Sequence, residues 1–192
     1  MNLPNKLTVA RIIATPIFMF AMITSFPGHY IVALVIFALA SYTDYLDGKI
    51  ARRDGLVTDF GKFLDPLADK MLTTAAYLGL LAAHACPGIT WIVFIVLFRE
   101  FMITSLRLVA VQNGTVIAAN MWGKAKTVCQ MVSIIVTLFI AAIANIVPNI
   151  SNTLAAIFML IITLLLWTSA VLTVISGVVY MVQNKDAFLS SK

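Results

Sequence analysis

Long apolar runs alternate with short polar segments along the whole chain. The apolar runs number about six and fall at residues 7–26, 31–52, 60–84, 89–111, 121–145 and 153–182. Each run is near the ~20 residues that a helix needs to cross a bilayer. We therefore predict an all-α integral membrane protein, in which one six-transmembrane-helix bundle fills residues 1–192 as a single domain.

The composition supports a membrane location. Hydrophobic residues make up 61% of the chain and charged residues 11%, whereas a soluble domain has roughly 25% charged residues. The first apolar run lacks a small-residue cleavage site, so we interpret it as a retained helix and not as a signal peptide.

The basic residues predict the orientation of the bundle. The predicted loops 27–30, 85–88 and 146–152 contain no Lys or Arg, and the basic residues gather near the opposite helix ends. Because cytoplasmic loops carry the excess of Lys and Arg, both termini should be cytoplasmic in a multi-pass protein of the cell (plasma) membrane. The net charge of +5 fits attraction to anionic lipid, and we expect no nucleic-acid partner.

One polar stretch stands out against this background. Residues 41–70 hold six of the eight acidic residues. Asp44 and Asp47 are three positions apart, and Asp65 and Asp69 are four apart, so each pair lies on one face of a helix. Two such helices side by side would gather four carboxylates. A charge at membrane depth is costly and usually functional.

Four carboxylates at one place indicate a metal site on the cytoplasmic side. Oxygen ligands select hard cations such as Mg²⁺ or Mn²⁺, and two divalent cations would neutralise the four charges. Paired metals about 4 Å apart suit in-line displacement at phosphorus. The alternative is a structural ion-pair network of these acids with Arg52 and Lys70.

Small and basic residues accompany the first acidic pair. Gly48 and Ala51 fall on the helix face of Asp44, where small side chains would let a bulky group approach the backbone. Arg52 follows one turn after Gly48 and offers a forked donor for phosphate.

Three further positions lie near the starts of predicted helices. Gly61 continues the stripe of the second acidic pair at a spacing of four. Thr58 is a plausible N-cap of the third helix, and Asn5 a plausible N-cap of the first.

A second charged group lies in the fourth and fifth apolar runs. Arg107, Lys124 and Lys126 should lie at one depth and could pair with the phosphate of a small polar substrate. The alternative is that they only anchor the helices at the cytoplasmic surface. Arg99 and Glu100 fall near mid-membrane, where a buried charge needs a partner. We interpret Glu100 as a residue that orients Arg99 or Arg107.

The spacing of the acidic stretch is specific. It is Asp44-x2-Asp47-Gly48-x2-Ala51-Arg52-x8-Gly61-x3-Asp65-x3-Asp69. This stretch resembles the signature of the CDP-alcohol phosphatidyltransferases at every fixed position, and the family's six-helix fold suits the full length of the chain.

Other motifs are similar to one branch of this family, the phosphatidylglycerophosphate synthases. These motifs are Arg99-Glu100-x6-Arg107, Gly123-Lys124-x-Lys126-Thr127 and Pro4-Asn5-x2-Thr8. They are weaker than the acidic signature because related branches share parts of them.

The resemblance implies a role for each matching residue. The four signature aspartates would bind two divalent cations, and Asp69 would also accept a proton from the incoming alcohol. Residues lining the CDP-diacylglycerol headgroup would be Gly48, Ala51, Arg52, Thr58, Gly61, Asn5 and Thr8. The phosphate of the acceptor, glycerol 3-phosphate, would be held by Arg107, Lys124 and Lys126.

The expected product pair is phosphatidylglycerophosphate and CMP, made by a homodimer surrounded by membrane lipid. Three alternatives stay open. The acceptor could be inositol phosphate, serine or another alcohol, including a CDP-choline-type reversal. Asp-rich membrane prenyltransferases also bind diphosphates through Mg²⁺, but they need more helices. Intramembrane carboxylates could also form a cation pathway, although a transporter more often shows repeated halves.

Overall fold

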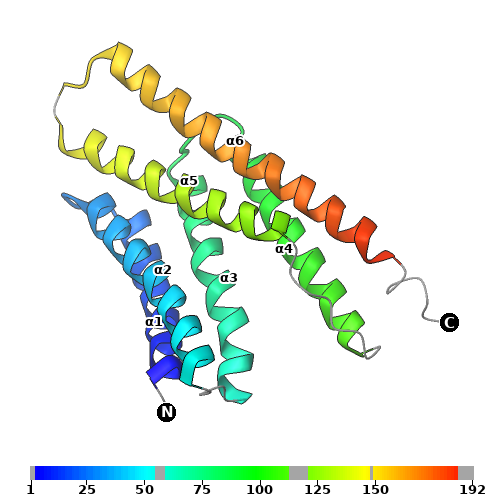
Figure 1. Ribbon diagram of the computed structural model, residues 1–192. Helices are drawn as coiled ribbons and strands as arrows, with labels where there is room; N and C mark the ends of the chain where they lie inside the picture. The colour runs from blue at the N-terminus through cyan, green and yellow to red at the C-terminus, as the bar shows by residue number, and fades with distance from the viewer. Residues whose placement is uncertain (1–2, 55–58, 113–120, 148, 186–192) are drawn as a thin grey trace. The chain divides into compact units, whose positions relative to one another are not determined.

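All the regular secondary structure in the described part of the chain is helical (Figure 1). In this computed structural model, backbone is described for residues 3–54, 59–112, 121–147 and 149–185. Within these ranges, the side chains of 3–4, 45, 47–54, 59–63, 65–66, 69 and 111–112 are not described. The six helices are α1 (Leu3–Ile23), α2 (His29–Asp54), α3 (Asp59–Ala82), α4 (Ile89–Gln112), α5 (Met121–Ile146) and α6 (Asn152–Gln183).

The prediction of a helix for each apolar run is confirmed, with small shifts at the ends. The first helix begins at Leu3, so the interpretation of Asn5 as its N-cap is wrong. Pro4 suits the first helical turn, where its missing N–H has no partner to lose. The same helix stops at Ile23, before the Pro27-Gly28 turn, and Gly28 has a φ of 77°.

The contacts divide the chain into two compact units. The first comprises Met1–Ala85 and Ile134–Phe158, and the second comprises Cys86–Ser133 and Met159–Lys192.

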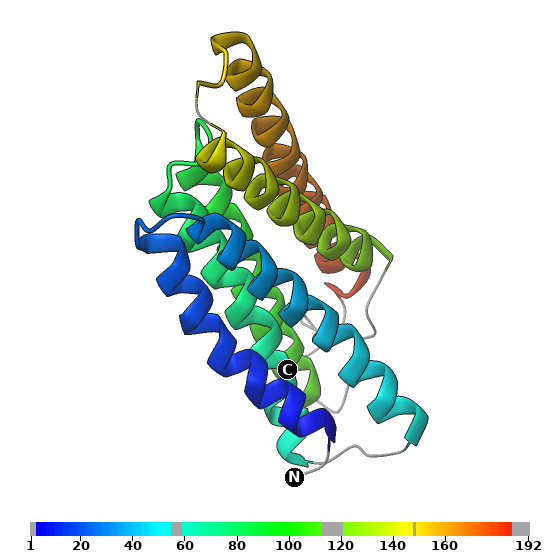
Figure 2. The same cartoon turned by 90° about the vertical axis from the view of Figure 1, so that its left-hand side faces the viewer.

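In the first unit, α1 packs against both α2 and α3, and the three helices lie side by side in both views (Figures 1 and 2). The rings of Phe18 and Phe37 are 5.8 Å apart between α1 and α2. A Cβ at Gly79 would lie 2.9 Å from Met22 Cγ, so this glycine lets α3 approach α1 closely. His29 Nδ1 lies 3.0 Å from Ala21 O and ties the turn to α1.

In the second unit, α6 presents small and polar side chains to its neighbours. Gln130 on α5 donates to Thr173 on α6 at 3.2 Å, and Ser133 Oγ donates to the carbonyl of Leu165 at 3.1 Å. A Cβ at Gly177 would lie 3.2 Å from Arg99 Cγ, so this glycine makes room for a buried arginine of α4. Small residues that let helices approach, with polar contacts between them, are typical of helix packing in membranes.

The described helices include three that are long and apolar enough to cross a membrane: Asn5–Ile23, Met121–Ile146 and Asn152–Gln183. A shorter apolar stretch, His29–Asp44, lies within α2. Large apolar side chains also lie exposed along α4, at Trp91, Phe94, Phe98 and Phe101. Exposed apolar surface of this extent fits a helix that faces lipid. The six-span arrangement and the cytoplasmic termini stay predictions.

Candidate functional site

The four signature aspartates lie on two helices of the first unit. Asp44 and Asp47 lie on α2, and Asp65 and Asp69 lie on α3. The prediction that each pair lies within one helix is therefore confirmed, and its spacing of three or four predicts a shared helix face. Asp44 is the one of the four whose side chain the structure describes, so the arrangement of all four carboxylates stays a prediction.

The predicted neighbours of the aspartates also lie on these helices. Gly48, Ala51 and Arg52 lie in the C-terminal part of α2, and Gly61 lies in the first turn of α3. Their side-chain surroundings are outside the described part of the structure, and Thr58 lies outside the described residues altogether.

Asp44 forms an ion pair with an arginine of α1. Arg11 Nη1 lies 2.5 Å from Asp44 Oδ1. The Arg11 side chain is 1% exposed and that of Asp44 is 40% exposed, so the guanidinium is enclosed while the carboxylate stays partly accessible. An oxygen ligand at the edge of solvent is chemically suited to a hard cation.

Arg11 belongs to a buried polar stripe along α1. Asn5, Thr8, Arg11 and Thr15 follow one another at spacings of three, three and four, and all are buried. Thr15 Oγ1 donates to the carbonyl of Arg11 at 2.9 Å. Because α1 packs against α2 and α3, this stripe lies within the three-helix unit that carries the aspartates. Asn5 and Thr8 therefore lie on the same face of α1 as Arg11, which pairs with Asp44.

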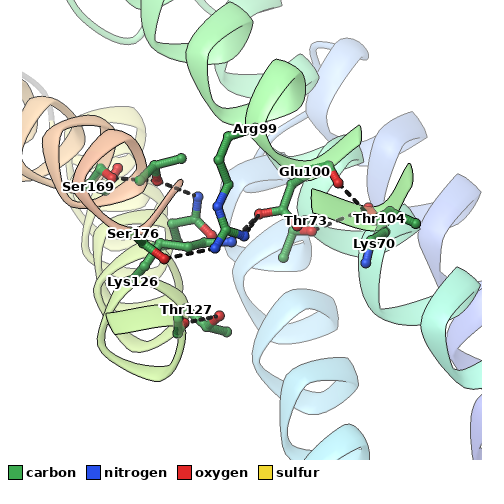
Figure 3. A network of polar contacts seen from close by, with 12 residues as sticks. Lys70, Thr73, Arg99, Glu100, Thr104, Lys126, Thr127, Ser169 and Ser176 are labelled. Atoms are coloured by element: carbon green, nitrogen blue, oxygen red, sulfur yellow. Dashed lines mark hydrogen bonds and ion pairs between the residues drawn. The ribbon is translucent and has the colours of Figure 1, made fainter. Parts of the chain in front are cut away.

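The second unit contains a buried group of charges from α4 and α5 (Figure 3). Glu100 Oε1 accepts from Lys126 Nζ and, at 3.4 Å, from Arg99 Nη1. Arg99 Nη2 donates to Ser176 Oγ on α6 at 2.7 Å. The side chains are 5% exposed for Lys126, 11% for Arg99 and 19% for Glu100. Among the described contacts, the group comprises two cations and one anion.

The other two predicted acceptor ligands are exposed. Arg107 Nε donates to Tyr180 Oη at 3.3 Å, and its Cζ lies 5.5 Å from the centre of the Tyr180 ring. Lys124 lies exposed in the first turn of α5. The structure thus joins Lys126 to Glu100 and Arg99, and joins Arg107 to α6.

Comparison with known proteins identifies the family. The family model for CDP-alcohol phosphatidyltransferase matches residues 1–183. The chain belongs to the CDP-alcohol phosphatidyltransferase family. The match extends over both compact units, and it confirms the resemblance seen in the acidic signature.

Curated relatives of this family align over nearly the whole chain. The CDP-diacylglycerol–glycerol-3-phosphate 3-phosphatidyltransferase of Bacillus subtilis (strain 168) is 40% identical over 99% of this chain and 98% of its own. The protein of that name from Rickettsia bellii is 34% identical over 97% of each chain. A probable phosphatidylglycerophosphate synthase of Mycobacterium tuberculosis is 42% identical over 69% of this chain and 64% of its own.

Two contacts in this family member were not predicted from the sequence. One is the ion pair of Arg11 with Asp44. Arg11 was counted among the basic residues that predict orientation, although its spacing from Asn5, Thr8 and Thr15 places all four on one helix face. For Glu100, the predicted contact with Arg99 is present, but its second partner is Lys126 and the described partner of Arg107 is Tyr180. Lys126 follows Glu100 by 26 residues, so no local spacing signals that pair.

Replacing Glu100 tests the buried pair. In Glu100→Gln, Lys126 stays buried without its carboxylate, which should lower the free energy of unfolding by about 3 kcal/mol. The measurement is thermal or denaturant unfolding of the purified protein in detergent. The double variant Glu100→Gln/Lys126→Met should recover part of this loss, because it removes one of the two buried cations, Lys126 and Arg99, that lose the Glu100 carboxylate. Ser105→Ala, at an exposed position of α4, is the control. If Glu100→Gln is as stable as this control, the pair does not stabilise the fold.

Proposed function

We propose that this protein transfers the phosphatidyl group of CDP-diacylglycerol to sn-glycerol 3-phosphate and releases phosphatidylglycerophosphate and CMP. The observation that carries the proposal is the alignment over 99% of the chain with a relative named for this reaction. The complete acidic signature on α2 and α3 supports a phosphoryl transfer, because carboxylates can hold the divalent cations that neutralise phosphate charge in such a reaction.

The signature aspartates suit two divalent cations. Mg²⁺ is the expected ion, and Mn²⁺ has similar ligand preferences. Asp44, Asp47, Asp65 and Asp69 would hold them, and the 40% exposure of the Asp44 side chain leaves that carboxylate accessible to a cation. When bound, the cations neutralise charge on the diphosphate of the lipid substrate.

The CDP-diacylglycerol headgroup is assigned to the same unit. Gly48, Ala51 and Gly61 carry little or no side chain, so a nucleotide could approach the helix backbone there. Arg52 would bind a phosphate through its forked guanidinium. Thr58 would contribute a hydroxyl group to this pocket. The buried polar side chains of Asn5 and Thr8 would add hydrogen-bonding groups from α1.

The acceptor phosphate is assigned to Arg107, Lys124 and Lys126. Arg107 and Lys124 are exposed, so both can meet a dissolved anion. Lys126 Nζ has three donors and pairs with Glu100 among the described contacts. The three basic side chains assigned here favour an anionic ligand over a neutral alcohol.

The chain's own residues supply the acid–base chemistry. Asp69 accepts the proton of the acceptor's hydroxyl group. The hydroxyl oxygen then bonds to the phosphatidyl phosphorus, and the bond from that phosphorus to the CMP oxygen breaks. Arg52 would hold the diphosphate, and Arg107, Lys124 and Lys126 would hold the phosphate of the acceptor. Transfer is direct, with no covalent intermediate on the protein.

The membrane setting follows from the same proposal. CDP-diacylglycerol carries its acyl chains in lipid, so the site must open both to the bilayer and to dissolved glycerol 3-phosphate. A six-span bundle in the plasma membrane with cytoplasmic termini meets this need, because it places the aspartates near the cytoplasmic interface. The protein is expected to form a homodimer.

A panel of acceptors tests this assignment. Purified protein in detergent receives CDP-diacylglycerol, Mg²⁺ and one alcohol at a time: glycerol 3-phosphate, inositol phosphate or serine. CMP release is the readout. We expect release with glycerol 3-phosphate at least ten times faster than with serine, which has no phosphate, because a missing charge-assisted contact costs about 1.5–3 kcal/mol. We also expect it to be faster than release with inositol phosphate. Faster release with another alcohol would keep the family and overturn the acceptor.

A further inference from the structure

Arg11 combines a permanent charge with nearly complete burial. Arginine side chains are cationic, yet Arg11 is 2% exposed. A buried charge of this kind is strongly destabilising unless it has a partner of opposite sign. Asp44, at 2.5 Å, is one such partner. The chain thus holds a fixed positive charge against one of its four signature carboxylates.

The location of Arg11 lets its charge act on the aspartate cluster. The four aspartates carry four negative charges when ionised, and Arg11 offsets one of them. The charge comes from α1, the helix that contacts both α2 and α3. Arg11 therefore links the helix beside the cluster to one of the two helices that carry it.

We propose that Arg11 is a positioning residue that holds Asp44 in place and acts as a built-in counter-ion of the aspartate cluster. The inference rests on the proposed function, because it takes Asp44 to be a cation ligand. Arg11 stabilises the cluster when cations are absent and lowers its affinity for them when they bind. The guanidinium does not touch the substrate in this role.

Arg11→Met should make the protein more dependent on divalent cations. Without the guanidinium, repulsion among the aspartates is relieved mainly by bound cation, so Mg²⁺ should raise the melting temperature more than in the unaltered protein. Mn²⁺ should bind about three- to ten-fold more tightly, because one nearby positive charge is gone. CMP release should nevertheless fall at least ten-fold, because Asp44 is no longer held in position.

Two variants serve as references for Arg11→Met. Lys6→Met removes an exposed positive charge from the same helix and should leave the Mg²⁺-dependent shift and the Mn²⁺ affinity unchanged. Arg11→Gln removes the charge but keeps a hydrogen-bond donor, and it carries the test if Arg11→Met does not fold. It should show the same larger Mg²⁺ shift.

The experiment compares melting temperatures in EDTA and in Mg²⁺, with Mn²⁺ titration followed by electron paramagnetic resonance. The expected result is a larger Mg²⁺ shift and tighter Mn²⁺ binding in the Arg11 variants than in the unaltered protein and Lys6→Met. If all four proteins show the same Mg²⁺ shift, Arg11 is only a bridge between helices and the inference is overturned. If the unaltered protein neither shifts with Mg²⁺ nor binds Mn²⁺, the proposed cation site itself fails.

Discussion

Replacing Asp69 by asparagine is expected to lower the rate of CMP release at least a thousand-fold. The change removes the proton acceptor, which contributes typically 10²–10⁴-fold in rate, and also removes a carboxylate from the cation ligands. The side chain keeps its size, so α3 should still form. The measurement is the initial rate of CMP release with CDP-diacylglycerol and glycerol 3-phosphate both in excess.

Asp59 offers a matched control for this prediction. It is an acidic residue at the first position of the same helix, and it lies outside the signature spacing. Asp59→Asn should therefore keep most of the activity. If Asp69→Asn keeps more than a tenth of the rate while it remains folded, Asp69 is neither the proton acceptor nor an essential cation ligand.

Replacing Lys124 or Lys126 by methionine is expected to raise the KM for glycerol 3-phosphate about ten-fold or more, because a hydrogen bond to a charged group contributes about 1.5–3 kcal/mol. The KM for CDP-diacylglycerol should stay within about two-fold, since that substrate is assigned to the other unit. Both constants come from initial rates with one substrate varied at a time.

The two lysines differ in a way that sharpens the test. Lys124 is exposed, so Lys124→Met should change acceptor binding with little loss of stability. Lys126 is buried against Glu100, so Lys126→Met should change acceptor binding and also lower the stability. Lys185→Met, at an exposed position after α6, is the control. An equal rise in KM for both substrates would overturn the acceptor assignment.

The helices were predictable because their signal is local. Each apolar run is long enough to form a helix, and the Pro-Gly turn after the first run marks its end. The error at Asn5 arose because an N-cap signal and an interior position of the first turn look alike when Pro4 precedes. The residue at which a helix begins depends on one or two side chains. A proline tolerated in the first turn moves that start toward the N-terminus.

The acidic signature was predictable because spacing along one helix decides which side chains share a face. Spacing of three and four places Asp44 with Asp47 and Asp65 with Asp69 without any tertiary information. Which residue of another helix meets them was not predictable in this way. Arg11 was interpreted as one of many basic residues at a cytoplasmic helix end, because the sequence does not say which face of α1 is buried.

The Glu100–Lys126 contact illustrates the same limit in the second unit. The sequence indicated that a charge near mid-membrane needs a partner, and the chain offers several arginines and lysines for that role. The choice among them depends on how α4 packs against α5, which is a tertiary property. Gly177 makes room for Arg99. This role was likewise not predictable, because it depends on how α6 packs against α4.

The most direct test of the central claim follows both products of one reaction. Purified protein in detergent receives CDP-diacylglycerol, Mg²⁺ and radiolabelled glycerol 3-phosphate. The account predicts that label enters the lipid phase in amounts equal to the CMP released, and that both stop when EDTA removes the cation. Absence of CMP release with this acceptor and with every other alcohol tested would contradict it.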